Sequence, residues 1–212
     1  MLKLRCKKYL ETIKTKLKKF RKFNSLNKLD KKMLNYMNFS DGFFIECGAN
    51  DGVNQSNTWY LEKYLNWHGI LIEPLKEKFM ELKKNRSYKN YFYNVVLSSS
   101  DNKKVFIENN GLMSKVINKT CKKKTLTKHK CKTLTAILDQ ALAPRLIDFF
   151  SLDVEGHEDE VIKGINFKKY NFKFFLIETK KKDIIQFLKE NKFKLIKKMS
   201  HHDYLFKYKN SI

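Results

Sequence analysis

The residues best suited to chemistry follow two short apolar runs near the start of the chain. The first run, residues 43–45, ends in an acid and passes into a turn that contains two glycines. Glycine adopts backbone angles closed to other residues, so the main chain of such a turn can approach a ligand closely. The second run, residues 70–72, ends in another acid about 20 residues beyond the turn, where a nucleotide-binding β-α-β unit places a carboxylate on ribose hydroxyls. The candidate cofactor-binding residues are therefore Glu46, Gly48, Asn50, Gly52 and Glu73.

Two more acids, Asp153 and Glu178, end later apolar runs. Carboxylates at the carboxyl end of a central parallel strand lie in the crevice where ligands bind in open α/β sheets, so we expect Asp153 to be functional. Glu155 and Glu158 are weaker candidates, because acids in a first helical turn also complement the helix dipole. His157 lies between them, and we expect it to be an exposed turn histidine rather than a base.

The elements that position these residues predict an α/β fold. Apolar runs too short for helices are typical of buried parallel strands, and they alternate here with segments of helical character, as in a doubly wound sheet. The expected strands are residues 43–46, 70–72, 91–97, 147–152, 174–178, 193–197 and 204–209. The expected helices are residues 58–65, 75–85, 133–138, a segment ending near residue 164, and residues 183–191.

The middle of the chain is the least regular part. Residues 104–108 predict a short strand, and residues 115–132 are rich in lysine and contain no acid. A long insertion between β-α units is where a substrate lid or binding loop usually lies. Its charge suits an anionic acceptor such as a phosphorylated or acidic glycan, and a solvated mobile loop is the alternative.

Composition limits the class of protein. The 212 residues, 42% of them hydrophobic, suffice for one domain with a sizeable core. A net charge of +23 suggests a polyanionic partner, but only four of the 45 basic residues are arginines, and lysine lacks the fork that suits phosphates and base edges. We therefore do not expect nucleic acid as a partner. No apolar run approaches the roughly 18 residues of a membrane span, and no secretory signal is recognised, so we expect a cytoplasmic protein. No set of possible metal ligands is complete, so we do not expect a bound metal.

Residues 1–40 differ from the rest, which we assign to one domain at residues 41–212. Apolar residues recur on one face between Leu2 and Phe20, and lysines occupy much of the other face. This pattern predicts a basic amphipathic helix. Such a leader, over residues 1–24, is suited to peripheral contact with an anionic membrane, and packing on the domain is the alternative.

The glycine turn favours one cofactor over another. A dinucleotide-binding loop also needs glycine at the positions of Asn50 and Val53, whereas an acid-x-Gly-x-x-x-Gly loop resembles motif I of class I S-adenosylmethionine-dependent methyltransferases. The chain as a whole, over residues 41–208, resembles the FkbM family of these methyltransferases. This resemblance is carried by the stretches FIECGANDGVNQSNTWYLEKYLNWHGILIEP, NVVLSSSDNKKVFI and IDFFSLDVEGHEDEVIKGINF.

The resemblance implies a Rossmann-like fold with a mostly parallel seven-stranded sheet, helices on both faces and an antiparallel C-terminal strand. It also implies methyl transfer from S-adenosylmethionine to a hydroxyl of a sugar, glycan or related acceptor. By position, the glycine-turn residues would line the methionine end, Glu73 the ribose, and Asp153 the place where methyl and acceptor meet. Asp153 is the leading candidate to take the hydroxyl proton, directly or by holding a cation, and Glu178 is the second.

Two other functions remain open from the sequence. The lysine content would suit an RNA methyltransferase. A module of the same fold that has lost catalysis and docks on glycans or membranes is the alternative from another class.

Overall fold

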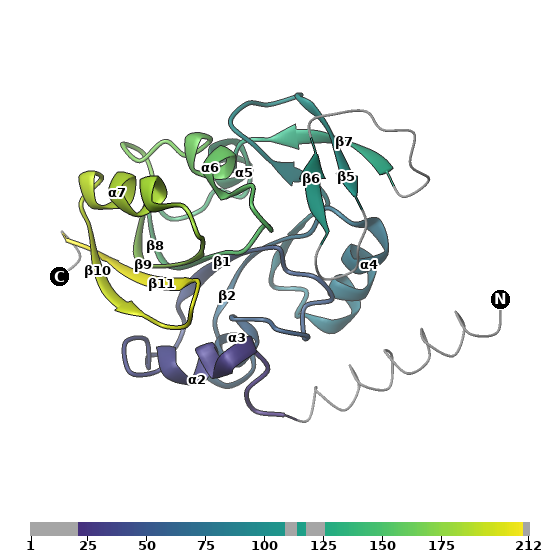
Figure 1. Ribbon diagram of the computed structural model, residues 1–212. Coiled ribbons are helices and arrows are strands. Elements are labelled where there is room, and N and C mark those ends of the chain that lie inside the picture. Colours follow the sequence, from purple (N-terminus) through teal and green to yellow (C-terminus); the bar gives the residue numbers. More distant parts are fainter. Residues whose placement is uncertain (1–20, 109–113, 118–125, 210–212) are drawn as a thin grey trace.

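A seven-stranded sheet forms the centre of the computed structural model, which describes residues 21–108, 114–117 and 126–209 (Figure 1). The strand order is β10-β11-β9-β8-β1-β2-β3, and every pairing is parallel except those of β11, which runs antiparallel to both of its neighbours. The predicted fold class is confirmed, including the antiparallel C-terminal strand. The strands are β1 Phe43–Cys47, β2 His68–Ile72, β3 Tyr91–Tyr93, β8 Leu146–Leu152, β9 Asn171–Glu178, β10 Phe193–Lys198 and β11 Asp203–Tyr208.

Helices cover both faces of this sheet (Figure 1). Alternate residues of the strands point to opposite faces, so β1 supplies Phe43 and Ile45 to one core and Phe44 to the other. One core is closed by α5 Leu134–Gln140, α6 Glu158–Lys163 and α7 Lys182–Glu190. The other is closed by α2 Leu29–Met33, α3 Trp59–Leu65 and α4 Lys76–Asn85, and a single turn, η1 Leu26–Lys28, precedes α2.

A second, four-stranded sheet lies beside the carboxyl ends of the central strands. Its order is β4-β7-β5-β6, formed by β4 Val96–Leu97, β5 Lys104–Glu108, β6 Lys115–Ile117 and β7 Leu126–Lys132. The prediction of a single strand at residues 91–97 was wrong, because β3 belongs to the central sheet and β4 to the second sheet. Asn94 lies between these two strands, and its side chain donates hydrogen bonds to the carbonyl oxygens of Glu73 and Pro74, both at 2.8 Å. The described parts of residues 115–132 are strands rather than a loop.

The leader is described only in part. The amphipathic helix expected between Leu2 and Phe20 lies outside the described residues. Within the rest of the leader, Leu29, Met33 and Met37 are buried in the core that contains Phe44. This part of the chain therefore packs as part of the globular core, and the division near residue 40 stays a prediction. Within the described ranges, no helix combines the length and the apolar character needed to cross a bilayer.

Candidate active site

The turn after β1 lies directly against the turn after β8. The backbone N–H of Gly48 donates to the carbonyl oxygen of Ile72 at 3.1 Å, and the N–H of Asp153 donates to that of Cys47 at 3.2 Å. Gly48 has φ of +79°, and an added Cβ would lie 1.9 Å from the carbonyl oxygen of Asp153. Only glycine permits this contact, so Gly48 fixes Asp153 beside the glycine turn.

A cavity opens where these turns meet the second sheet. Its empty space, together with the open solvent at its mouth, measures about 960 Å³. Its lining comes from the glycine turn, the segment after β2, the turn after β8 and the second sheet. Four of the seven predicted site residues belong to this lining: Gly48, Asn50, Glu73 and Asp153.

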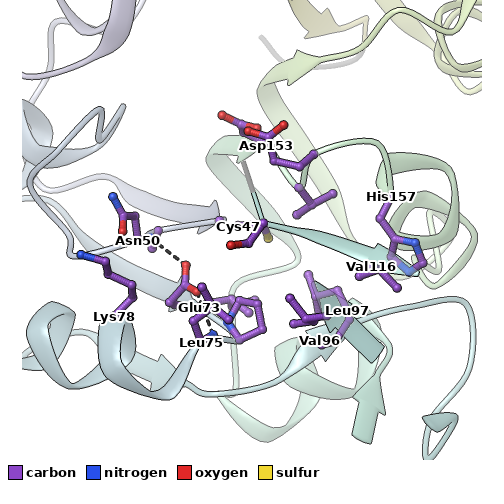
Figure 2. A pocket seen from close by; sticks show the side chains of 18 of the residues that line it. Cys47, Asn50, Glu73, Leu75, Lys78, Val96, Leu97, Val116, Asp153 and His157 are labelled. Atoms are coloured by element: carbon purple, nitrogen blue, oxygen red, sulfur yellow. Dashed lines mark hydrogen bonds between the residues drawn. The ribbon is translucent and has the colours of Figure 1, made fainter. Parts of the chain in front are cut away.

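Glu73 is the buried acid on the β2 side of the cavity (Figure 2). One carboxylate oxygen accepts the N–H of Asn50 and the other accepts the N–H of Leu75, both at 2.8 Å. Burial raises the pKa of Glu73 to about 7, although these two hydrogen bonds and the charge of Lys78 oppose the shift. The residue thus joins the glycine turn to the segment after β2 and ionises near neutral pH.

Asp153 lies apart from Glu73 in the close view, with Cys47 between them (Figure 2). Burial, followed by the negative charges of Glu178 and Glu155, raises the pKa of Asp153 well above its usual value. The carboxyl of Glu178 is also a hydrogen-bonding partner of Asp153, and this contact contributes to the raised pKa of Asp153. The structure brings both predicted catalytic residues together, although Glu178 is not itself among the lining residues.

The turn after β8 has an unusual backbone. Glu155 and Gly156 both have positive φ, of 53° and 95°. The backbone N–H of Gly156 donates to the buried carboxylate of Glu158 at 2.8 Å, and the ammonium of Lys181 donates to the carbonyl oxygen of Gly156 at 3.2 Å. Glu158 therefore shapes the turn, whereas Glu155 lines the cavity.

Glu46 lies in a different environment from the one its sequence position suggests. Its side chain is 3% exposed and does not line the cavity. Its carboxylate accepts hydrogen bonds from Ser56 Oγ at 2.9 Å, the N–H of Asn57 at 2.6 Å and Thr58 Oγ1 at 2.6 Å. It thus anchors the segment that leads into α3, and its predicted contact with a cofactor stays a prediction.

Arg86 completes this buried network and was not recognised in the sequence. Its side chain is fully buried, and it pairs with Glu62 at 2.7 Å and with Glu46 at 3.3 Å. Burial alone would raise the pKa of Glu62, but the charge and hydrogen bond of Arg86, with help from Lys63, lower it. Gly52 lies beside this network rather than in the cavity lining, since an added Cβ would meet the side chains of Leu82 and Arg86.

The expectation of an exposed turn histidine at position 157 was wrong. His157 is half-buried and lines the cavity, and its Nε2 atom is buried without a hydrogen-bond partner in the structure. Burial lowers the pKa of its imidazole, although the charges of Glu160 and Asp159 oppose the shift. The sequence offered no signal for this position, because an acidic turn around a histidine is equally typical of a solvated helix start.

Among the residues that the structure describes, no three His, Cys, Asp or Glu side chains are arranged to hold a metal ion. The expected absence of a metal stays a prediction.

The model of the methyltransferase FkbM domain matches residues 46–205. A methyltransferase FkbM structure from Methylobacillus flagellatus is 14% identical with a TM-score of 0.53, covering 82% of this chain but only 45% of that one. The structure of a precorrin-6y C5,15-methyltransferase from Geobacter metallireducens is 10% identical, with a TM-score of 0.44, and the match covers 85% of each chain. The structure of a proposed RNA methyltransferase from Pyrococcus horikoshii is 12% identical, with a TM-score of 0.44, and the match covers 86% of this chain and 83% of that one.

The last two likenesses are too weak to carry an argument, and the first shows the fold alone. A comparison with curated protein sequences gives no significant match. The family model, however, spans most of the chain and both acidic turns. The chain therefore belongs to the FkbM methyltransferase domain family.

Proposed function

We propose that the protein transfers a methyl group from S-adenosylmethionine to a hydroxyl oxygen of a sugar or glycan. Membership of a methyltransferase family supports methyl transfer. The observation that carries the proposal is one cavity lined by a buried acid, Glu73, in one part and by Asp153 in another, where Asp153 is paired with Glu178 outside the lining. The first acid suits the diol of a ribose, and the pair suits an acceptor that must lose a proton.

The cavity residues fit the proposed methyl donor. Glu73 can accept hydrogen bonds from ribose hydroxyls, as acids do after the second strand of nucleotide-binding folds. Gly48 lets the glycine turn lie directly against the main chain of Asp153, because a Cβ there would collide with the carbonyl oxygen of Asp153. Leu75, Val96 and Leu97 give an apolar wall for a purine base. When bound, the donor supplies a methyl group already activated by a positively charged sulfur, which Asp153 and Glu155 complement.

The chain itself then has two tasks. Holding the acceptor oxygen in line with the methyl group can contribute about 7–11 kcal/mol. Accepting the hydroxyl proton can contribute a further factor of about 10²–10⁴. The oxygen forms a bond to the methyl carbon, the bond from that carbon to sulfur breaks, and the hydroxyl proton passes to the carboxylate of Asp153. Because burial and Glu178 raise the pKa of Asp153, this carboxylate is a stronger base than an exposed aspartate.

An anionic acceptor is supported by the second sheet. Ile107 lies on the face that borders the cavity, whereas Lys104, Lys128 and Lys130 are exposed on the opposite side of the strands. Lys104 lies directly across from Lys130 in the ladder, where like charges repel unless an anion is near. We propose an acidic or phosphorylated glycan whose anionic part extends over this outer face, because the lysines point away from the cavity.

The proposal is tested by calorimetry and by methyl transfer. The full chain should bind S-adenosylmethionine, and Glu73→Ala should abolish binding while Glu77→Ala, which changes an exposed acid in the first turn of α4, should not. Label from the methyl donor should then enter host glycans rather than lipid or RNA fractions. Label in RNA, with binding that weakens steeply with salt, would favour the RNA methyltransferase instead. Absence of donor binding would leave the non-catalytic docking module.

A further inference from the structure

A loop that lines the cavity contains a strained residue. The loop runs from Asn50 to Ser56, and its residues Asn50, Asn54, Gln55 and Ser56 belong to the lining. Its backbone is left-handed at Asn50, Gly52 and Gln55, with φ of 48°, 79° and 62°. Glycine adopts this conformation freely and asparagine tolerates it, but glutamine does not. Gln55 is therefore the position in this loop whose conformation must be held by other parts of the structure.

The leader supplies such a contact to Gln55. The loop is tied at its start to the carboxylate of Glu73 and at its end to that of Glu46. Between these ties, Gln55 forms an isolated parallel β-bridge with Ser25. Ser25 is not among the lining residues, and it lies outside residues 46–205, which match the family model.

The backbone around Ser25 is fixed by contacts on both sides. The carboxylate of Asp30, which is 2% exposed, accepts the N–H of Asn24 at 2.7 Å and that of Ser25 at 3.1 Å. The Ser25 hydroxyl donates to the same carboxylate at 2.7 Å and accepts the N–H of Asp30 at 2.7 Å. Before the bridge, Phe23 stacks on Tyr60 of α3, with ring centroids 4.9 Å apart. A buried carboxylate and an aromatic contact thus set the place of Ser25.

These contacts bear on the affinity for a ligand in the cavity. A strained residue at a binding site persists only when the surrounding structure holds it. The left-handed region is disfavoured about 5- to 30-fold for a residue such as glutamine, so a loop released from Ser25 would leave its present conformation most of the time. The apparent affinity of a ligand falls in proportion to the fraction of protein in the binding conformation.

We propose that Ser25 and Asp30 are positioning residues for the methyl donor, which hold the loop after the glycine turn in its binding conformation through the bridge to Gln55. This inference rests on the proposed function. It makes the leader a part of the donor site, although neither Ser25 nor Asp30 lines the cavity.

The first test is calorimetry of the full chain with S-adenosylhomocysteine. Ser25→Ala should raise the Kd about 5- to 30-fold, and Ser25→Thr, which keeps the hydroxyl, should bind as the native chain does. Thr135→Ala is the matched control. The Thr135 hydroxyl also donates one hydrogen bond, to the carbonyl oxygen of Gly164 at 2.9 Å, and accepts one, from the N–H of Asn166 at 2.8 Å, but it lies outside the cavity lining. This variant should leave the Kd unchanged.

Three results of the calorimetry would overturn the proposal. The first is a native Kd in Ser25→Ala. The second is an equal rise in Thr135→Ala, since affinity would then only follow the stability of the fold. The third is a Kd for Ser25→Thr as high as that for Ser25→Ala.

Hydrogen exchange on the native chain gives a second test that needs no variant. Coupling between two sites is reciprocal, so S-adenosylhomocysteine should slow exchange of the backbone N–H groups of Asn24 and Ser25 as well as those of residues 50–56. The N–H groups of β10, at the far edge of the central sheet, should exchange at the same rate with and without the ligand. Protection of residues 50–56 without protection of Asn24 and Ser25 would overturn the proposal.

The outcomes separate this inference from the proposed function. If the native chain does not bind S-adenosylhomocysteine, the methyl-donor assignment fails and this inference fails with it. If the native chain binds it and Ser25→Ala binds it equally well, the proposed function stands and only the role of the leader is refuted.

Discussion

Replacing Glu73 with glutamine tests the methyl-donor pocket most directly. Glu73 is 6% exposed, and its two carboxylate oxygens accept one backbone N–H each, from Asn50 and Leu75 at 2.8 Å. Glutamine has the same size but no charge and only one acceptor oxygen. It therefore removes the ionic hydrogen bond to a ribose hydroxyl and leaves one of the two backbone donors without an acceptor.

The magnitude follows from the charge and the pKa. A hydrogen bond to a charged group contributes about 1.5–3 kcal/mol, so Glu73→Gln should raise the Kd for S-adenosylhomocysteine about 10- to 150-fold at pH 8. The pKa of Glu73 is raised to about 7, and ribose hydroxyls donate to the ionised form. Above pH 7 that form already dominates, whereas below pH 7 each pH unit should weaken binding to the native chain by about tenfold. The variant lacks this dependence, so the two affinities should converge towards pH 6.

The assay is calorimetry between pH 6 and pH 8 on the native chain, Glu73→Gln and Glu77→Gln. The last variant removes an exposed acid close to Glu73 in the chain and should bind as the native chain does. Melting temperatures of the three proteins check that the fold is kept. An affinity ratio between native chain and Glu73→Gln that stays constant over this pH range would refute the reasoning, even if the variant binds more weakly.

Three further predictions concern other parts of the structure. Asp153→Asn should reduce methyl transfer about 10²–10⁴-fold, since it removes the proton acceptor, while the calorimetric Kd for S-adenosylmethionine changes little. Arg86→Met should lower the free energy of unfolding by about 3–5 kcal/mol in urea titrations, because it leaves the buried carboxylate of Glu46 without a cation and that of Glu62 with Lys63 alone, and Glu62→Gln in the same chain should recover part of that loss. Gly48→Ala should destabilise the protein far more than Gly156→Ala in thermal unfolding, because both residues have positive φ but only the first has a backbone atom in the way of a Cβ.

Each of these has an outcome that contradicts it. A collapse of donor affinity in Asp153→Asn would place this residue in the cofactor pocket rather than in proton transfer. An additive double variant would mean that Arg86 and Glu62 are not coupled. Equal melting temperatures for the two glycine variants would show that the turns after β1 and β8 can separate without cost.

The sequence predicted the central sheet well because its signals are local. Apolar runs such as 147–152 and 174–178 became β8 and β9 with nearly the expected bounds. The amphipathic pattern of the segment at 183–191 likewise became α7, whose buried residues Ile184 and Leu188 are one helical turn apart. A pattern of apolar residues at period two or period 3.6 lies within one segment of the chain, so it can be read without the tertiary structure.

The environment of each acid could not be predicted in this way. Glu46 and Glu73 both end apolar strands, but Glu46 projects toward Arg86, which lies 40 positions later, whereas Glu73 projects into the cavity. The same limit applies to His157, whose partial burial depends on packing between the turn after β8 and the second sheet rather than on its own segment. Of the second sheet, only β5 was expected as a separate strand. β4 lies at the end of the strand expected at residues 91–97, and β6 and β7 lie in a lysine-rich stretch whose charge favoured a loop.

By itself, the sequence determined the α/β class, the order of its main elements and the position of acids and glycines at the ends of strands, since these follow from local patterns of burial and backbone freedom. Only the tertiary structure decided which of those acids face the cavity and which form ion pairs with a buried arginine. It also decided that one imidazole nitrogen of a histidine is buried without a hydrogen-bond partner. The physical reason is that a carboxylate or an imidazole takes its role from the charges, donors and solvent around it, and these are brought by segments distant in the chain.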